Sequence, residues 1–554
     1  MGVPGFFAWI NKRYSSKGTI VDFNKSTMKV NELFLDANSI IYNVIKDVPT
    51  ELTSKDEIER LIIKLTIEHI LTLYDLIKPS DIMMISIDGV APCAKIIQQR
   101  NRRYLSTYQE VLINEAKKKY NIKSLNWTRL NITPGTVFME KLHKSLEDFV
   151  SKFNKSHKCK MIYTSYNDYG EGEHKIIDYI KSNPVETSKV RYIYGLDADL
   201  LFLTMSLSNN NIFLIRENIV KSEETEEYVY QVVNIDKLKH NLYHYCQTHD
   251  RELKYSQNLI NDIIFICFLF GNDFIPTAQI FSIHDDMGIF IDGYMTSKTE
   301  MGGQDAYLTN ENNINMIFFN SFLNYLSTKE QELYTKGIYQ KRMEKFNIRN
   351  KCIAKDKKGF DLEQFKIDTL IYPELTHYHP SFAQYKKNTY CIYHKYPNTD
   401  DMHKIFVKYI TGLMWNYFYY FKISPKTLDG KTMKLTNMWN YQYPFAPFIS
   451  DLHNFISFNM FNVNVNFSKF NSDCIDVIDD KIQLNPYQQL ICVIPYTKLK
   501  EVNEELFNKV CSDSYVQLIN PLSYGVYTYN CLQFYKCKAN VPFISFDKII
   551  KMVI

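Results

Sequence analysis

Three separate runs of apolar residues in this chain each end at a carboxylate. The runs cover residues 32–36, 81–88 and 190–199, and they end at Asp36, Asp88 and Asp199. Continuous apolar runs of this length are typical of strands that are buried on both faces of a parallel α/β sheet. Ligands of such sheets bind at the carboxyl edge of the strands. Because carboxylates buried side by side without partners are costly, a shared divalent cation is the simplest explanation for them.

The other segments support an α/β fold with more than one lobe. Strand-like and helix-like segments alternate in the N-terminal part, with a helical period over residues 57–76, which predicts a twisted, mainly parallel central sheet flanked by helices. A chain of 554 residues exceeds one ordinary core. We therefore expect a first domain at residues 1–345, a linker at 346–384, where charges scatter, and an aromatic-rich second lobe at 385–554 packed on the first.

Composition disfavours several classes of protein. The strongest apolar run, residues 263–270, falls far short of the roughly 20 residues that a membrane span needs, and the N-terminus has no apolar leader. The 11 cysteines form no Cys-x-x-Cys pair, which disfavours a zinc knuckle, and their odd number disfavours a disulfide framework. A net charge of +4 is too small to indicate nucleic-acid binding by itself. We expect a soluble protein of the reducing cytoplasm, without membrane contact.

Two carboxylate pairs add to the strand-end acids. Asp197 and Asp199 lie two residues apart at the expected strand end, so both side chains can project from one face and share a cation. The alternative is a turn in which an Asp caps the next helix. Glu171 and Glu173 flank Gly172 just before a helical pattern, which places two carboxylates at a helix N-terminus where the glycine permits close approach.

A seventh acid, Asp273, follows the apolar run at residues 263–270, so we expect a buried helix to deliver it at a turn. Mg²⁺ and Mn²⁺ prefer hard oxygen ligands, and two such ions can activate water and stabilise the leaving oxygen in phosphodiester cleavage. The expected catalytic and metal-binding cage consists of Asp36, Asp88, Glu171, Glu173, Asp197, Asp199 and Asp273.

A basic segment begins seven residues after Asp88. Residues 95–119 contain seven Lys or Arg residues but only two Glu residues. Lys95, Gln99, Arg102 and Arg103 are spaced i, i+4, i+7 and i+8, so a helix would gather all four on one face. Arg offers forked donors to phosphate oxygens, Lys a point charge and Gln a neutral donor. We interpret the four residues as a phosphate pocket, and the alternative is a solvated helix face.

Taken together, these residues resemble the Xrn family of 5′-to-3′ exoribonucleases. Family-like motifs occur in family order at residues 1–4, 88–92, 98–103, 132–139, 170–175, 195–200 and 271–276. In the second lobe, residues 409–420, 443–448 and 486–490 look like the second region of the family. The resemblance therefore spans most of the chain.

The resemblance implies a nuclease core of the PIN and flap type, with a catalytic first domain and a second lobe that completes the active-site pocket. The seven acids would bind two Mg²⁺ ions, and Mn²⁺ would be able to substitute. The basic helix face would grip the 5′-monophosphate of single-stranded RNA, and processive cleavage would release nucleoside 5′-monophosphates one at a time. We expect a preference for RNA rather than absolute exclusion of single-stranded DNA.

Three more site residues follow from the resemblance. Tyr42 stands where the family has a His that stacks on the terminal base, and a Tyr ring can also stack. Pro92 matches a proline at the entrance, where a Trp helps to exclude duplex. Trp439 is our candidate for that Trp, and a core Trp is the alternative, because residues 422–438 differ from the Trp-rich segment of the family. The aromatic cluster at residues 415–421 is expected to be core.

Two other functions compete with this interpretation. A flap-type 5′ nuclease acting on DNA shares the acidic core, but that class usually follows its last Asp with a helix-hairpin-helix, where this chain has residues 277–281. A non-catalytic RNA-binding scaffold would have no reason to retain seven acids. Since the sequence has no cysteine-rich knuckle and no convincing basic nuclear signal, we expect an enzyme of the cytoplasmic type. The chain also lacks the long C-terminal domains of the large cellular enzymes, so we expect a compact form encoded by a large DNA virus and able to be packaged in a virion. We further expect a monomer.

Overall fold

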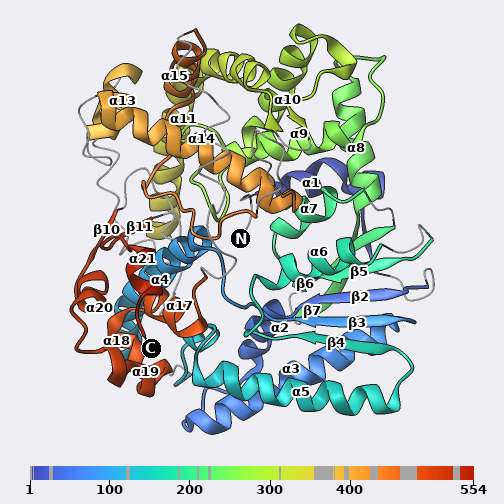
Figure 1. Cartoon of the computed structure of the whole chain (residues 1–554), viewed down its shortest axis with the longest axis vertical. Coiled ribbons are helices and arrows are strands. Elements are labelled where there is room, and N and C mark those ends of the chain that lie inside the picture. The colour runs from blue at the N-terminus through green and yellow to red at the C-terminus, as the bar shows by residue number, and fades with distance from the viewer. Residues whose placement is uncertain are drawn as a thin grey trace.

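The central sheet contains seven strands within the part of the chain that the computed structural model describes. The described residues are 3, 5–23, 29–119, 125–184, 188–208, 211–221, 226–310, 313–354, 379, 381–391, 399–424, 434–461, 483–527 and 537–553. The strand order is β1-β7-β6-β5-β2-β3-β4 (Figure 1). The strands are β1 (Ile20–Asp22), β2 (Glu32–Asp36), β3 (Ile82–Ser86), β4 (Lys160–Thr164), β5 (Arg191–Tyr194), β6 (Ile212–Lys221) and β7 (Glu226–Asn234).

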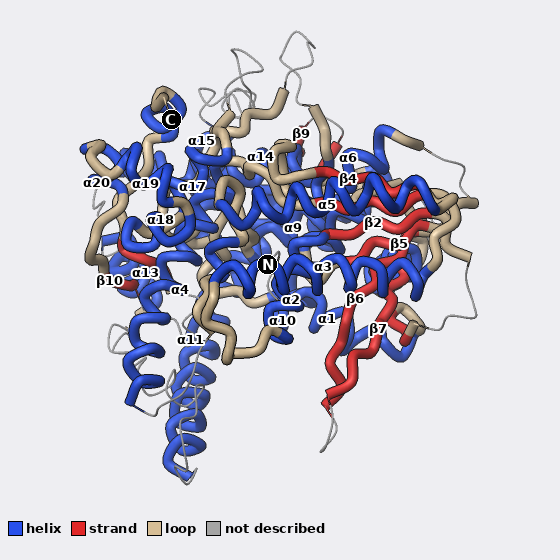
Figure 2. Tube along the Cα trace, turned by 90° about the horizontal axis from the view of Figure 1, so that it is seen from below, coloured by secondary structure: helices blue, strands red, loops and turns tan. Residues whose placement is uncertain are grey.

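The sheet is mainly parallel, as the sequence predicts. β6, β5, β2, β3 and β4 run parallel to one another. At one edge, β7 pairs antiparallel with β6, and β1 pairs antiparallel with β7. β6 and β7 are the longest strands described, and they extend beyond the others as a two-stranded arm (Figure 2). The three acid-ending runs of the sequence correspond to β2, β3 and β5, which are adjacent in the sheet.

Successive residues of β2 belong to two different cores, which explains its uninterrupted apolar sequence. Leu33 and Leu35 pack with α3 (Lys55–Ile77) and α5 (Val137–Ser156). Phe34 packs on the opposite face with α6 (Gly172–Ser182) and α7 (Asp199–Met205). The helix expected at residues 57–76 is thus confirmed as α3, and helices flank both faces of the sheet (Figure 1).

The helices around the N-terminal domain follow one another closely. Their bounds are α1 (Phe6–Tyr14), η1 (Ser15–Lys17), α2 (Ala37–Val44), η2 (Ile45–Asp47), α4 (Cys93–Lys119), η3 (Arg129–Asn131), α8 (Ile235–Gln247), α9 (Gln257–Cys267), η4 (Phe268–Phe270), α10 (Ile283–Glu300), η5 (Gly303–Asp305) and α11 (Met316–Ala354). A short hairpin joins β8 (Thr309–Asn310) to β9 (Asn313–Ile314). None of the described helices combines the length and the apolar character that crossing a membrane requires.

The aromatic-rich region shares a core with the first domain. The helices α13 (Phe382–Thr389), α14 (Thr399–Phe421) and α15 (Ile449–Phe461) contribute buried residues to the same cluster as α7, α9 and η4. In Figure 1, α14 crosses directly beside α7. The expectation that residues 415–421 are core is confirmed, because every residue from Trp415 to Phe421 is buried.

The C-terminal helices pack against α4 (Figure 1). They are α17 (Pro486–Val493), α18 (Tyr496–Val502), α19 (Glu504–Val510), α20 (Ser514–Ile519) and α21 (Phe546–Ile550), with a hairpin of β10 (Gly525–Tyr527) and β11 (Lys538–Asn540). Their apolar residues form a third core with Cys93 and Ile96 of α4. The basic helix α4 therefore packs against the C-terminal helices.

The predicted linker at 346–384 falls largely outside the described residues. α11 continues to Ala354, so its last turns occupy the first residues of that range, and α13 begins at Phe382. Residues 355–378 and 380 are not described. The boundaries 1–345 and 385–554 stay a prediction, as does any role for residues 1, 2 and 4 of the N-terminal motif, which are also outside the described part.

Candidate functional site

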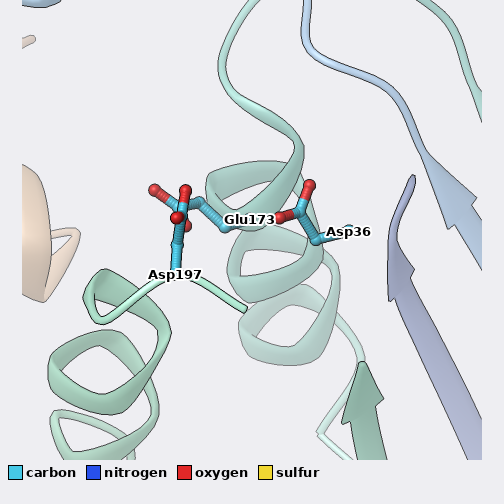
Figure 3. Close-up of side chains that lie close together, drawn as sticks. All are labelled: Asp36, Glu173 and Asp197. Atoms are coloured by element: carbon cyan, nitrogen blue, oxygen red, sulfur yellow. The ribbon is translucent and has the colours of Figure 1, made fainter. Parts of the chain in front are cut away.

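The carboxyl ends of three parallel strands bring acidic side chains together. Asp36 is the last residue of β2, Asp88 follows β3, and Asp197 lies in the loop after β5. The carboxylate oxygens of Asp36, Glu173 and Asp197 lie within 4.8 Å of one another, and Figure 3 shows these three side chains facing one another. Convergence of acids at this edge of the sheet is therefore observed for these three residues.

The expectation that Asp197 and Asp199 share one face of a strand is wrong. β5 ends at Tyr194, Asp197 is exposed in the following loop, and Asp199 is the first residue of α7, with 1% of its surface exposed. The capping alternative is not observed either, because Ala198 is the N-cap residue and makes no side-chain cap. The chain leaves the strand at Gly195, where a Cβ atom would lie 2.2 Å from Leu200 Cδ1.

The helix α6 places Glu171 and Glu173 as the sequence predicts. Glu171 is the N-cap residue of α6, and Glu173 lies in its first turn. The Gly172 N–H donates to Asp88 Oδ1 at 2.7 Å, and a Cβ atom at Gly172 would lie 3.1 Å from Asp36 Oδ1. A side chain at this position would force its neighbours to shift, so glycine favours the close approach of α6 to the ends of β2 and β3.

Lys95 contacts two of the buried acids, Glu171 and Asp273. Lys95 Nζ of α4 lies 2.5 Å from Glu171 Oε2 and 2.6 Å from Asp273 Oδ2. Asp273 follows η4 and is buried, so the expected buried helix that delivers this acid at a turn is confirmed. Gln98 Nε2 also donates to Asp273 Oδ1, at 3.2 Å. α4 and the end of η4 therefore meet at the carboxyl edge of the sheet.

Burial and mutual repulsion shift the pKa values of these acids. Desolvation and neighbouring carboxylates raise the pKa of Asp36 and of Glu173 well above their ordinary values. The same causes raise the pKa of Asp199 to about 7. Burial acts to raise the pKa of Asp273 too, but the charge of Lys95 holds it well below its ordinary value. A metal-free site therefore holds carboxylates that resist ionisation.

This donor set fits divalent cations of the hard type. Glu173 Oε2 is buried and has no hydrogen-bond partner among the described residues. All the acids offer oxygen ligands, which Mg²⁺ and Mn²⁺ prefer. The positive charge of a bound cation would offset the repulsion between these carboxylates. An acidic cluster able to hold a metal is thus present in the described part of the chain.

The four residues expected in the phosphate pocket all lie on α4. Lys95, Gln99 and Arg103 are buried, whereas Arg102 is exposed. Gln99 Oε1 accepts a hydrogen bond from Gln489 Nε2 at 3.2 Å, and Arg103 donates to Thr133 Oγ1. Burial lowers the pKa of Arg103 to about 10. The predicted helix is confirmed, and the binding of phosphate by its residues stays a prediction.

The structure also places the three residues that came from the family resemblance. Tyr42 is half-buried on α2, the helix that starts directly after Asp36. Pro92 is buried, and the next residue, Cys93, donates from its N–H to the Asn437 carbonyl at 2.9 Å. That hydrogen bond brings the segment before Trp439 alongside Pro92.

Trp439 is a core residue in this structure. Only 4% of its surface is exposed, and its ring stacks on Trp415 with centroids 5.3 Å apart and planes inclined by 22°. This burial fits the alternative of a core Trp better than contact with nucleic acid. A role at the entrance remains a prediction for Pro92 and Trp439.

Sequence reasoning missed several residues that contact the acids. The Tyr419 hydroxyl donates to Glu171 Oε1 at 3.1 Å, and the Tyr420 hydroxyl donates to Asp199 Oδ1 at 2.6 Å. Asn38 Nδ2 donates to Asp88 Oδ2 at 2.7 Å. No periodic pattern distinguishes these residues from ordinary core or helix residues, so the sequence carries no signal for their role.

Two family models match the chain. The XRN 5′-3′ exonuclease N-terminus matches residues 1–218, and the Xrn1 helical domain matches residues 254–377. The chain belongs to the Xrn family. The resemblance seen in the sequence is thereby confirmed, and the motifs at residues 88–92, 98–103 and 170–175 lie within the first Xrn match.

Named Xrn relatives come from cells and from a virus. Human 5′-3′ exoribonuclease 1 is 26% identical, with 89% of this chain and 30% of the relative covered. 5′-3′ exoribonuclease 1 of Saccharomyces cerevisiae is 30% identical over 60% of this chain and 23% of the relative. The protein of Acanthamoeba polyphaga mimivirus that is named a putative 5′-3′ exonuclease is 30% identical over 39% of this chain and 36% of its own length. The chain therefore spans less than a third of the first two relatives.

Proposed function

We propose that this chain is a processive 5′-to-3′ exoribonuclease that degrades 5′-monophosphorylated single-stranded RNA to nucleoside 5′-monophosphates. The observation that supports this function best is the meeting of buried acids with the basic helix α4 at the carboxyl edge of the sheet, in a chain of the Xrn family. The names of its relatives agree with this activity.

Two Mg²⁺ ions are the proposed cofactors, and Mn²⁺ would be able to replace them. The residues that would hold them are Asp36, Asp88, Glu171, Glu173, Asp197, Asp199 and Asp273. Bound divalent cations supply an activated water and stabilise the leaving oxygen in phosphodiester hydrolysis. The protein contributes the rigid placement of its carboxylates, because Gly172 and Asn38 donate to Asp88 and Lys95 contacts Glu171 and Asp273.

The position of α4 accounts for cleavage next to the 5′ end. Lys95 contacts both Glu171 and Asp273, so a terminal phosphate held by Lys95 and Arg102 would lie directly beside the acids. A terminal monophosphate carries more charge than an internal diester, and converging cationic donors therefore favour it. A cap would add a second nucleotide at this terminal phosphate, so we expect a capped end not to fit.

The proposed substrate contacts extend to the first base and to the entrance. Tyr42 would stack on the terminal base, since its half-buried ring belongs to α2, the helix that begins directly after Asp36. Pro92 and Trp439 would shape the entrance and exclude duplex. We further propose that the enzyme acts as a monomer in the cytoplasm, with single-stranded RNA as its main partner.

Family membership favours 5′-to-3′ exoribonuclease activity over the two other functions. Flap-type DNA cleavage and a non-catalytic scaffold would use the same fold, but relatives of this chain are named 5′-3′ exoribonucleases. A scaffold also gives no reason for buried carboxylates that repel one another.

A nuclease assay tests the proposal. Single-stranded RNAs with a 5′-monophosphate, a 5′-hydroxyl or a cap are compared with 5′-phosphorylated single-stranded DNA and a flapped DNA duplex, each with Mg²⁺ and with a chelator. We expect Mg²⁺-dependent release of mononucleotides, fastest from monophosphorylated RNA. Fastest cleavage at the flap junction, with oligonucleotide products, would support the DNA nuclease instead, and cleavage of no substrate would support the scaffold.

A further inference from the structure

We infer that Tyr419 and Tyr420 of α14 are positioning residues of the metal centre, so that metal affinity depends on the aromatic region as well as on the acids. This inference rests on the proposed metal-dependent function. The Tyr420 hydroxyl donates to Asp199 Oδ1 at 2.6 Å, and the Tyr419 hydroxyl donates to Glu171 Oε1 at 3.1 Å. Two adjacent residues of one helix therefore hold two acids that come from α7 and α6.

Both phenol rings are fixed by packing on several sides. The centroid of the Tyr419 ring lies 4.1 Å from that of the His174 ring. The Tyr419 ring also stacks on Trp415, with centroids 4.7 Å apart. The Tyr420 ring lies 5.0 Å from the ring of Phe268 in η4. Because these neighbours leave the rings little freedom, each hydroxyl points at its carboxylate before any ligand arrives.

A hydroxyl donor suits a metal ligand better than a cationic donor would. It satisfies one carboxylate oxygen and fixes the orientation of the group, while it adds no positive charge that would compete with a cation. Glu171 illustrates the contrast, since its Oε2 contacts the ammonium of Lys95 and its Oε1 takes the Tyr419 hydroxyl. Residues that orient metal ligands in this way contribute strongly to metal affinity in other proteins.

The competing explanation is that each buried hydroxyl donates to whichever acceptor lies within reach, without any role at the metal site. Two other tyrosines of α14 provide the comparison. Tyr417 lies two residues before Tyr419 on the same helix, and its hydroxyl donates to the Asn310 carbonyl at 2.6 Å. The Tyr409 hydroxyl donates to the Pro276 carbonyl at 3.2 Å. These buried phenols bond to neutral backbone. Of the four, Tyr419 and Tyr420 are the pair that bonds to the acids.

The test compares Tyr420→Phe, Tyr419→Phe and the control Tyr417→Phe in the full chain without RNA. Mn²⁺ binding is measured by electron paramagnetic resonance of the free ion, and thermal midpoints are measured in chelator. We expect Tyr420→Phe to weaken Mn²⁺ binding by about tenfold to a hundredfold, and Tyr419→Phe to weaken it in the same direction. Tyr417→Phe should leave Mn²⁺ binding within about twofold of the unmodified protein, because its hydroxyl donates to the Asn310 carbonyl.

The outcomes separate this inference from the proposed function. If the unmodified protein binds Mn²⁺ and both Tyr419→Phe and Tyr420→Phe bind it equally well, the positioning role is refuted and the metal site stands. Equal weakening by all three variants would also refute it, since the cause would then be general loosening of α14. If the unmodified protein binds no Mn²⁺, the metal site and the positioning role fail together.

Discussion

At the scale of single residues, the site consists of carboxylates in unequal environments. Asp197 is exposed, Asp199 is fully buried beside a phenol hydroxyl, and Asp273 is paired with Lys95. Burial without a compensating cation is unfavourable for the ionised form. The acids therefore differ in what their removal should do to stability, although all seven are proposed to serve the same reaction.

Asp197→Ala should abolish hydrolysis without unfolding the protein. The side chain is exposed, so its loss leaves no cavity, but it removes one of three carboxylates that lie within 4.8 Å of one another. We expect Mg²⁺-dependent turnover to fall by about a thousandfold or more, which corresponds to several kcal/mol of lost catalysis. Turnover is measured on monophosphorylated RNA beside a thermal melt. A variant with nearly unchanged turnover would argue against a catalytic role for Asp197.

Asp199 should make the metal-free protein less stable as the pH rises. Its folded-state pKa is raised from 3.8 to about 7, so its contribution to stability is complete below pH 3.8 and is lost as the pH rises through 7. Asp199→Asn does not titrate and keeps an oxygen for the Tyr420 hydroxyl. In chelator, the thermal midpoint of Asp199→Asn minus that of the unmodified protein should increase between about pH 5 and about pH 8. A difference that stays constant would contradict the raised pKa.

At the scale of elements, α4 has two faces with two tasks. Lys95 faces the acids, whereas Arg100 faces the C-terminal lobe. The Arg100 guanidinium donates to the Cys492 carbonyl at 2.6 Å, to Asn520 Oδ1 at 3.1 Å and to the Ile519 carbonyl. The helix α4 thus carries the proposed phosphate pocket on one face and is anchored to the C-terminal helices by the other.

Arg102→Ala and Arg100→Ala should impair different properties of the protein, although each removes one guanidinium from α4. Arg102 is exposed, so its loss should reduce the preference for a 5′-monophosphate over a 5′-hydroxyl and leave stability nearly unchanged. Arg100 is 2% exposed, and its loss leaves buried acceptors unpaired, which should cost about 2 to 4 kcal/mol of the free energy of unfolding. Denaturant unfolding measures the stability of both variants. Their end preference is measured by the decay rates of RNA with a 5′-monophosphate and of RNA with a 5′-hydroxyl. An unchanged end preference in Arg102→Ala would count against the pocket.

At the scale of the whole molecule, the site joins segments that are far apart in the chain. The hydrogen bonds from Tyr419 and Tyr420 to the acids span 248 and 221 residues. The core that contains α14 also contains α7, α9 and η4. Ligands that bind only the folded site should therefore stabilise the first domain and the aromatic region together.

Mg²⁺ should raise the thermal midpoint of the whole protein. Binding to the folded state alone stabilises by about 2.7 kcal/mol at a concentration about 100 times the dissociation constant. Glu173→Gln, which removes a buried carboxylate charge, should melt higher than the unmodified protein in chelator and respond less to Mg²⁺. Differential scanning fluorimetry with and without Mg²⁺ measures both effects. A midpoint that is insensitive to Mg²⁺ in the unmodified protein would contradict the proposed metal site.

The sequence by itself determined the sheet edge and the elements that reach it. The apolar runs at residues 32–36 and 81–88 and the helical period at 57–76 correspond to β2, β3 and α3. Local periodicity predicts these elements because it reports which faces of one segment are buried. The acids at the strand ends follow from the same patterns, since parallel strands bring their carboxyl ends to one edge.

Only the tertiary structure decided which side chains meet at that edge. Asp199 belongs to α7 instead of a strand because the chain turns at Gly195, where a side chain would clash with Leu200. Trp439 is buried on Trp415, and the Tyr420 hydroxyl reaches an acid more than two hundred residues away. Such contacts depend on how helices from distant segments pack, and the burial pattern of a single segment carries no information about its partner.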